Sequence, residues 1–233
     1  MQARNIIICL CTSRTIIKKE KAIAIAAILR EKGENVQLCP DLCRTMQQAE
    51  TARQVAGHTI LACYPRAIRS HFATYNCEPG EIVDIRNLTL EEILVQLQLT
   101  ETGHPDLSSI QEEIAGFTPE PGTDAWYPVI DKERCAECEK CHDFCLFGVY
   151  ALEEGRVKVA QPQNCKNNCP ACARICPAKA IIFPKYEKSP INGGLEDEEL
   201  AISLDTKAVY ADALRMRLQH RRASISLVRK DKP

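Results

Sequence analysis

Eight of the fourteen cysteines in this 233-residue chain stand in two short groups. The first group has the pattern Cys-x2-Cys-x2-Cys-x3-Cys, and the second has Cys-x3-Cys-x2-Cys-x3-Cys-Pro. The groups are Cys135, Cys138, Cys141 and Cys145, then Cys165, Cys169, Cys172 and Cys176. Thiolates at this density are typical ligands of iron–sulfur clusters, in which each iron corner takes one cysteine.

The spacing also indicates how the ligands divide. Three closely spaced cysteines wrap a loop around three corners of a cubane, and the fourth points away toward the other cluster. One [4Fe-4S] cluster is therefore expected on Cys135, Cys138, Cys141 and Cys176, and the other on Cys165, Cys169, Cys172 and Cys145.

Two other uses of these cysteines are disfavoured. A structural zinc site pairs two separated Cys-x2-4-Cys motifs, not four cysteines within eleven residues. Disulfides need an oxidising compartment, and nothing in the chain indicates export. His142 lies inside the first group, but with all four cysteines present we expect it near the cluster rather than bound to iron.

Short apolar runs flank the two groups and predict strands. These runs are 129–131, 148–152, 157–159 and 180–183, the middle two joined by a Gly-containing turn. With the cysteines, they make residues 129–186 resemble the two-[4Fe-4S] bacterial ferredoxin family. Two departures, Leu146 where proline is common and three residues between Cys165 and Cys169, remove no ligand.

The N-terminal half alternates between strand and helix periodicity. Strands are expected at 5–9, 35–38, 59–62 and 81–85, and helices at 18–31, 44–56, 66–73 and 88–99. Such alternation predicts a small parallel sheet with covering helices and right-handed crossovers. The expected fold class is thus an α/β N-terminal domain, an α+β ferredoxin domain and a C-terminal helix.

Five further cysteines follow the ends of three predicted strands. They are Cys9, Cys11, Cys39, Cys43 and Cys63. The carboxyl ends of parallel strands border one crevice, so these thiols are expected to converge there. A third cluster, a zinc site, a redox dithiol at Cys9 and Cys11, and plain buried thiols all remain open. Cys77 stands in a polar loop and is expected to bind nothing.

Four short motifs link this half to a known family. They are Cys9-Leu10-Cys11, Asp41-Leu42-Cys43, Ala62-Cys63-Tyr64-Pro65-Arg66 and Asp84-Ile85-Arg86. Their order and spacing resemble the N-terminal domain of the heterodisulfide reductase A subunit. The resemblance implies a third [4Fe-4S] cluster on Cys9, Cys11, Cys43 and Cys63, with Cys39 as an alternate ligand. The family's flavin-binding Gly-x-Gly-x-x-Gly turn is missing, so no flavin is expected on this chain.

The predicted organisation has four parts. Residues 1–116 form the α/β domain, 117–128 a Pro- and Gly-rich linker, 129–186 the ferredoxin domain and 187–233 a tail. A helix is expected at 206–222 in this tail. Its basic end either docks on a partner or frays while the helix packs on the protein's own core.

The charge and residue composition of the chain argue against some classes of function. The net charge of −1 and 5% aromatic residues argue against nucleic-acid binding. No apolar run is long enough for a membrane span, and the cysteine content without an export signal favours the reducing cytoplasm.

The sequence favours an iron–sulfur electron-transfer subunit of a larger redox complex in anaerobic metabolism. Its expected partners are flavin- or metal-containing subunits and a soluble ferredoxin, and the chain is not expected to be catalytic alone. Two alternatives remain: a thiol/disulfide-active enzyme component that uses the N-terminal cysteine crevice, and a redox-sensing iron–sulfur protein.

Overall fold

The computed structural model describes residues 3–99, 105–117 and 125–195. All of them belong to one compact unit, Met1–Glu199. The predicted tail helix at 206–222 and most of the predicted linker lie outside the described residues. The division of the chain into separate domains therefore stays a prediction.

A four-stranded parallel sheet forms the centre of the N-terminal half. Its strands are β1 (Asn5–Cys9), β2 (Asn35–Cys39), β3 (Thr59–Ala62) and β4 (Ile82–Asp84), in the order β2-β1-β3-β4. Cys9 pairs with Cys39 across the first two strands. Ile6, Ile7 and Ile8 are buried, as expected for a parallel strand covered on both faces. The sheet confirms the predicted α/β fold of this half.

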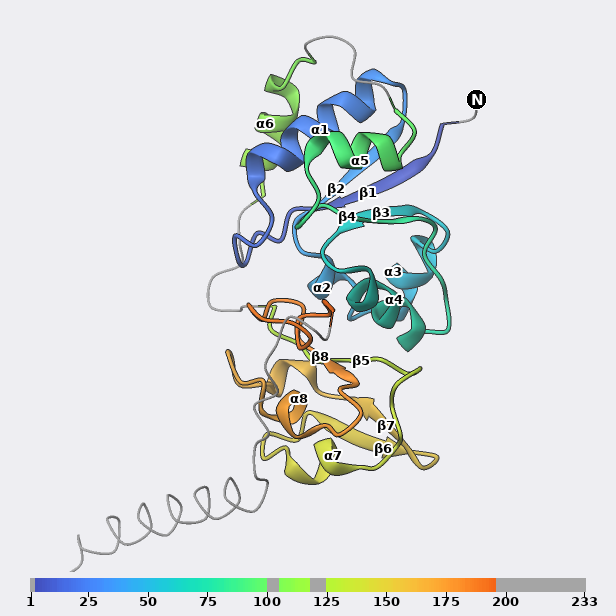
Figure 1. Cartoon of the computed structure of the whole chain (residues 1–233), viewed down its shortest axis with the longest axis vertical. Helices are drawn as coiled ribbons and strands as arrows, with labels where there is room; N and C mark the ends of the chain where they lie inside the picture. The colour runs from blue at the N-terminus through green and yellow to red at the C-terminus, as the bar shows by residue number, and fades with distance from the viewer. Residues whose placement is uncertain (1–2, 100–104, 118–124, 196–233) are drawn as a thin grey trace, which may run out of the picture. The chain divides into compact units, whose positions relative to one another are not determined.

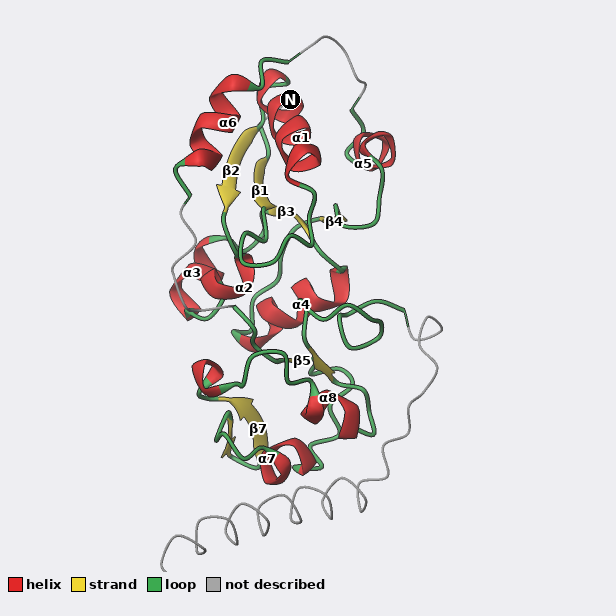
Figure 2. Ribbon diagram, turned by 90° about the vertical axis from the view of Figure 1, so that its left-hand side faces the viewer, coloured by secondary structure: helices red, strands yellow, loops and turns green. Residues whose placement is uncertain are grey.

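Helices cover the sheet, as Figures 1 and 2 show, with α1 and α6 packed together on one side. They are α1 (Lys19–Glu31), α2 (Leu42–Thr45), α3 (Ala49–Gln54), α4 (Pro65–Thr74), α5 (Leu90–Gln96) and α6 (Ser108–Ala115). The prediction of one helix over 44–56 was wrong. The chain makes two short helices there, because Met46 turns into the core and Gln48 takes extended backbone.

The cysteine-rich half contains two antiparallel strand pairs. Its elements are β5 (Val129–Ile130), α7 (Lys140–Phe144), β6 (Tyr150–Glu153), β7 (Arg156–Val159), the 3-10 turn Pro162–Asn164, α8 (Ala171–Ile175) and β8 (Ile181–Ile182). β5 pairs with β8 and β6 with β7. Glu154 and Gly155 both take positive φ, the conformation that a tight hairpin turn requires. All four predicted strands are present with shorter or shifted ends.

The β5–β8 pair lies between two hydrophobic cores. Val129 pairs with Ile182, and both pack in the core of the parallel sheet. Ile130 pairs with Ile181, and both pack in the core of the cysteine-rich half. Successive strand residues point to opposite faces, so this two-stranded sheet joins the two cores directly.

Candidate metal centres

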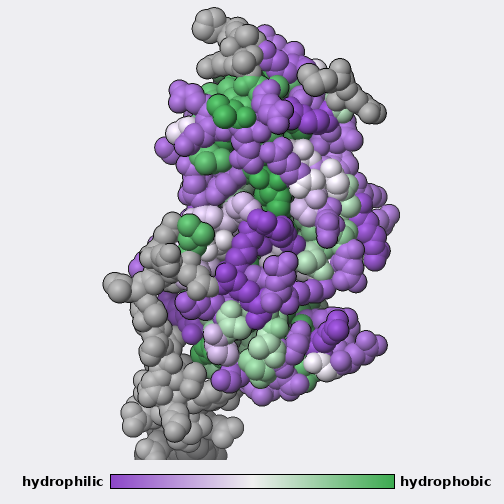
Figure 3. Space-filling view, turned by 45° about the vertical axis from the view of Figure 1, so that its right-hand side comes forward, coloured by the Kyte–Doolittle hydropathy of each residue, from purple (hydrophilic) through white to green (hydrophobic). Residues whose placement is uncertain are grey.

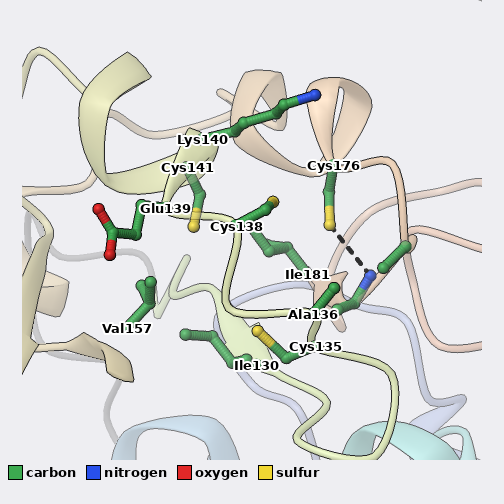
Figure 4. Close-up of a pocket in the computed structure, with 12 residues that line it drawn as sticks. Ile130, Cys135, Ala136, Cys138, Glu139, Lys140, Cys141, Val157, Cys176 and Ile181 are labelled. Carbon is green, nitrogen blue, oxygen red and sulfur yellow. Dashed lines mark hydrogen bonds between the residues drawn. The ribbon is translucent and has the colours of Figure 1, made fainter. Parts of the chain in front are cut away.

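The first candidate centre is a cavity that holds four thiols of the cysteine-rich half. Cys135, Cys138, Cys141 and Cys176 all line it. Figure 4 shows them arriving from the loop after β5, from α7 and from the segment before β8. They are the four cysteines that the spacing assigned to one cluster, and apolar side chains such as Ile130 and Val157 complete the wall.

The backbone of the first loop explains this convergence. Glu137 and Glu139 take positive φ, which lets three cysteines wrap inward over seven residues. Glu137 also accepts a hydrogen bond from the Val157 amide at 2.8 Å, which anchors the loop to β7. The Ala180 amide lies 3.3 Å from the Cys176 sulfur, a contact that stabilises a thiolate.

The second candidate centre joins Cys145 to the other loop. Burial, followed by the neighbouring charges of Cys169 and Cys145, raises the pKa of Cys165 to about 12. Burial also raises the pKa of Cys172, although a hydrogen bond from Tyr150 lowers it; Cys165, Cys145 and Cys169 raise it further. These four thiols are therefore close enough for their charges to influence one another. The Tyr150 hydroxyl donates to the Cys172 sulfur at 3.0 Å, a contact that spacing gave no sign of.

The third candidate centre is a cavity at the carboxyl ends of the parallel strands. It is lined by Cys9, Cys11, Cys43 and Cys63, which are 6%, 7%, 6% and 8% exposed. The Leu42 amide lies 3.4 Å from the Cys9 sulfur. Four of the five strand-end thiols that were expected to converge thus line one cavity.

Two other cysteines lie apart from this cavity's lining. The Cys39 sulfur is 3.4 Å from the Thr45 hydroxyl. The Cys77 thiol donates to the Phe72 carbonyl at 3.4 Å. Neither residue lines the third cavity. Cys39 pairs with Cys9 across the sheet, so it is a neighbour of the four lining cysteines.

The electrostatics of the third cavity suit a metal cluster better than free reactive thiols. Burial, before any other cause, raises the pKa of Cys9 and Cys43 well above the ordinary value and that of Cys63 to about 12. A reactive cysteine needs the opposite, a lowered pKa. Bound metal supplies the positive charge that deprotonates a coordinating thiol. Four cysteines around one cavity match the number of ligands that a cubane takes.

A single metal ion makes tighter demands than a cluster. Across residues 3–99, 105–117 and 125–195, no three His, Cys, Asp or Glu side chains are placed to hold one ion. The two ferredoxin-type cysteine sets also lack a single-ion arrangement. The third cavity therefore does not differ from them in this respect.

Two arginines of the N-terminal half form hydrogen bonds with the cysteine-rich half. Arg66, three residues after Cys63, donates to the Asp131 carboxylate at 2.7 Å and to the Lys179 carbonyl at 2.5 Å. Arg14, three residues after Cys11, donates to Asn167 at 3.0 Å and Asn168 at 2.5 Å. These asparagines stand in the second cysteine loop, which has the extra residue. The extended loop is thus used as a contact surface.

The face of the molecule drawn in Figure 3 is mostly hydrophilic, with apolar side chains in small areas. Leu146, Phe147 and Leu152 are 63%, 42% and 40% exposed and follow Cys145 closely in sequence. None of the described helices is long and apolar enough to cross a membrane.

Known proteins match part of the chain. Pyruvate synthase subunit PorD of Methanocaldococcus jannaschii is 35% identical over 85 residues, which is 32% of this chain and 96% of that protein. Ferredoxin-3 of Nostoc is 36% identical over 78 residues, 24% of this chain and 79% of its own length. The chain belongs to the ferredoxin family. Uncharacterized ferredoxin MJ0251 of Methanocaldococcus jannaschii is 52% identical over 67 residues, 28% of this chain and 45% of that ferredoxin.

These ferredoxin relatives support an iron–sulfur electron-transfer role. The chain spans less than half the length of MJ0251 but nearly all of PorD. No protein-family model matches the chain. The matches cover at most about a third of it, and the resemblance of the N-terminal half to heterodisulfide reductase A stays a prediction.

Proposed function

We propose that this ferredoxin-family chain is the electron-transfer subunit of a larger cytoplasmic oxidoreductase complex in anaerobic metabolism. Residues 129–186 would form a ferredoxin domain with two [4Fe-4S] clusters, and residues 1–116 an α/β domain with a third. The observation that carries the proposal is that two cavities are each lined by four cysteines, and that a further set of four lies close enough to interact electrostatically.

Each set has the donors that a cubane requires. Cys135, Cys138, Cys141 and Cys176 would hold the first cluster, Cys165, Cys169, Cys172 and Cys145 the second, and Cys9, Cys11, Cys43 and Cys63 the third. When bound, a [4Fe-4S] cluster takes up and releases single electrons. The chain's own work is to hold the sulfurs, donate hydrogen bonds to them and exclude water, which set the potential.

The contacts between the two halves favour a relay within one chain. Arg66 and Arg14 bind residues of the ferredoxin loops from positions close to Cys63 and Cys11. These contacts would hold the third cluster in a fixed position relative to the other two. The PorD relatives are named as subunits of pyruvate synthase, which supports a place within a larger enzyme complex. The partner that we propose there carries a flavin or metal centre. A soluble ferredoxin is the other proposed partner.

The alternative of a thiol/disulfide enzyme makes an opposite demand on the N-terminal cysteines. It needs a low-pKa thiol, whereas burial raises the pKa of Cys9, Cys43 and Cys63. We therefore place electron transfer first.

The proposal is tested by counting electrons. Protein purified without oxygen is titrated with a one-electron reductant while the visible absorption of the clusters is followed. About three electrons per chain are expected, one for each cubane. About two electrons would confine the activity to the ferredoxin domain, and a chain that takes up none reversibly would contradict an electron-transfer role.

A further inference from the structure

A buried lysine from the cysteine-rich half closes the N-terminal thiol cavity. Lys185 follows β8 by three residues and is 3% exposed. Together with Pro184 it lines the cavity that contains Cys9, Cys11, Cys43 and Cys63. The α/β part alone thus does not complete this site, because one wall and one charged side chain come from beyond the ferredoxin cysteines.

Two side chains of the α/β part hold this lysine. Its Nζ contacts the Asp41 Oδ2 atom and the Ser13 hydroxyl, and Ser13 donates to the same Asp41 oxygen at 2.6 Å. The side chains of Lys185 and Asp41 are 2% and 5% exposed. An ion pair at this depth is screened little by salt, so its charges act strongly on neighbouring groups.

The surroundings keep Lys185 in its charged form. Its ammonium group lies against the Asp41 carboxylate and the Ser13 hydroxyl, and both contacts favour the charged form. The nearby imidazole of His71 adds no charge, because burial lowers its pKa to about 4. Within the described part of the chain, His71 Nε2 and Asp41 Oδ1 are buried with no hydrogen-bond partner.

A second pair of charged residues near the cavity, Asp84 and Arg86, is less deeply buried. Asp84 and Arg86 act on Cys63, Arg86 lowering the pKa of that thiol and Asp84 raising it. Arg86 is only half-buried, with its guanidinium stacked on the Tyr64 ring at 4.9 Å. Lys185 is therefore the more deeply buried of these two cations.

We propose that Lys185 is a positioning residue that sets the reduction potential of the N-terminal cluster. This inference rests on the third cluster of the proposed function. A cluster held by four thiolates gains one negative charge on reduction, so a buried ammonium beside it favours the reduced form. Asp41 opposes the lysine and holds it in place. The C-terminal extension of the ferredoxin strands thereby tunes a site built by the parallel sheet.

The test is a redox titration of the iron-loaded full chain, followed by electron paramagnetic resonance. The signal of the N-terminal cluster is identified as the one lost in Cys43→Ala. Lys185→Met is expected to lower the potential of that signal, changing its reduction constant at least about tenfold, or 59 mV for one electron. Lys188→Met removes the same charge at an exposed position three residues later and is expected to change nothing.

Asp41→Asn separates electrostatics from damage to the structure. It leaves the lysine uncompensated and is expected to raise the same potential. Both substitutions break one ion pair, so a merely structural role would move the potential in the same direction in both. If the Lys185→Met protein lost its N-terminal iron, the potential measured in Asp41→Asn would decide the question.

Failure of this inference can be told apart from failure of the proposed function. About eight irons in the unmodified chain would contradict the third cluster, and the role of Lys185 with it. About twelve irons, with the N-terminal potential unchanged in both charge variants, would overturn the role of Lys185 alone. Opposite shifts in the two variants, with the other two clusters unaffected, would support it.

Discussion

The ferredoxin loops and the N-terminal cavity are two different ways of gathering four thiols. In the loops, close spacing brings the cysteines together, and all of them except the buried Cys172 are partly or fully exposed. In the N-terminal cavity, three strand ends bring together four buried residues that lie 54 positions apart from first to last, Cys9 to Cys63. The first arrangement depends on local sequence and the second on the fold.

The two halves also differ in what supports them without metal. The core of the parallel sheet is extensive and includes fully buried residues such as Ile8, Ile25 and Phe72. The core of the cysteine-rich half is small, and several of the proposed ligands pack against it. In the cysteine-rich half, the proposed clusters are thus expected to form part of the core. In the N-terminal half, the proposed cluster is expected to add to a core that is already complete.

Removal of iron is the change with the largest expected effect on this comparison. Chelation without oxygen should unfold the cysteine-rich half, because binding free energy of a metal centre is folding free energy where the site is not otherwise preformed. Amide hydrogen exchange should show lost protection in β6 and β7 and retained protection in β1 and β3. Equal loss of protection in both halves would contradict the proposed difference in how much each half depends on metal. Cys43→Ala, which spares the ferredoxin ligands, is the matched control.

Replacing Arg66, one of the two arginines that contact both halves, should have the next largest effect. Arg66→Ala leaves the Asp131 carboxylate, whose side chain is 10% exposed, without its 2.7 Å partner. Loss of one partner from a largely buried pair should lower the free energy of unfolding by about 3 kcal/mol. Denaturant titration measures it. Arg69→Ala changes an exposed arginine on the same helix and should cost little; equal costs would show that the Asp131 pair contributes nothing.

A single hydrogen bond to sulfur should have the smallest effect. Tyr150→Phe removes the 3.0 Å bond to Cys172 while keeping the ring. Losing a hydrogen bond that is about 1 kcal/mol stronger in the reduced cluster would lower that cluster's reduction constant roughly fivefold. A redox titration should show the shift in the second cluster alone. Tyr127→Phe is the control, and an unchanged potential would remove Tyr150 from the set of tuning residues.

Periodicity and spacing predicted much of this molecule, because they reflect local rules. Alternating strand and helix signals gave the parallel sheet, and the bounds predicted for β1 and β3 match the structure. The polar stretch at 44–56 had no apolar rhythm to show where α2 ends and α3 begins. The predicted helix there was continuous for that reason.

Contacts between distant residues were beyond the reach of these rules. Lys185 and Asp41 lie 144 positions apart, and Arg66 and Lys179 lie 113 apart. No spacing signal marks such pairs, since only the folded chain brings them together. Nothing in the sequence of Tyr150 separates it from an ordinary core tyrosine. The convergence of strand-end cysteines could be predicted only because the topology of a parallel sheet was predicted first.

The most direct measurement is iron and acid-labile sulfide per chain in anaerobically purified protein, with Cys43→Ala beside it. Three cubanes predict about twelve irons in the unmodified chain and about eight in the variant. About eight irons in both would contradict a cluster in the N-terminal cavity and leave a two-cluster ferredoxin with a thiol-rich α/β half.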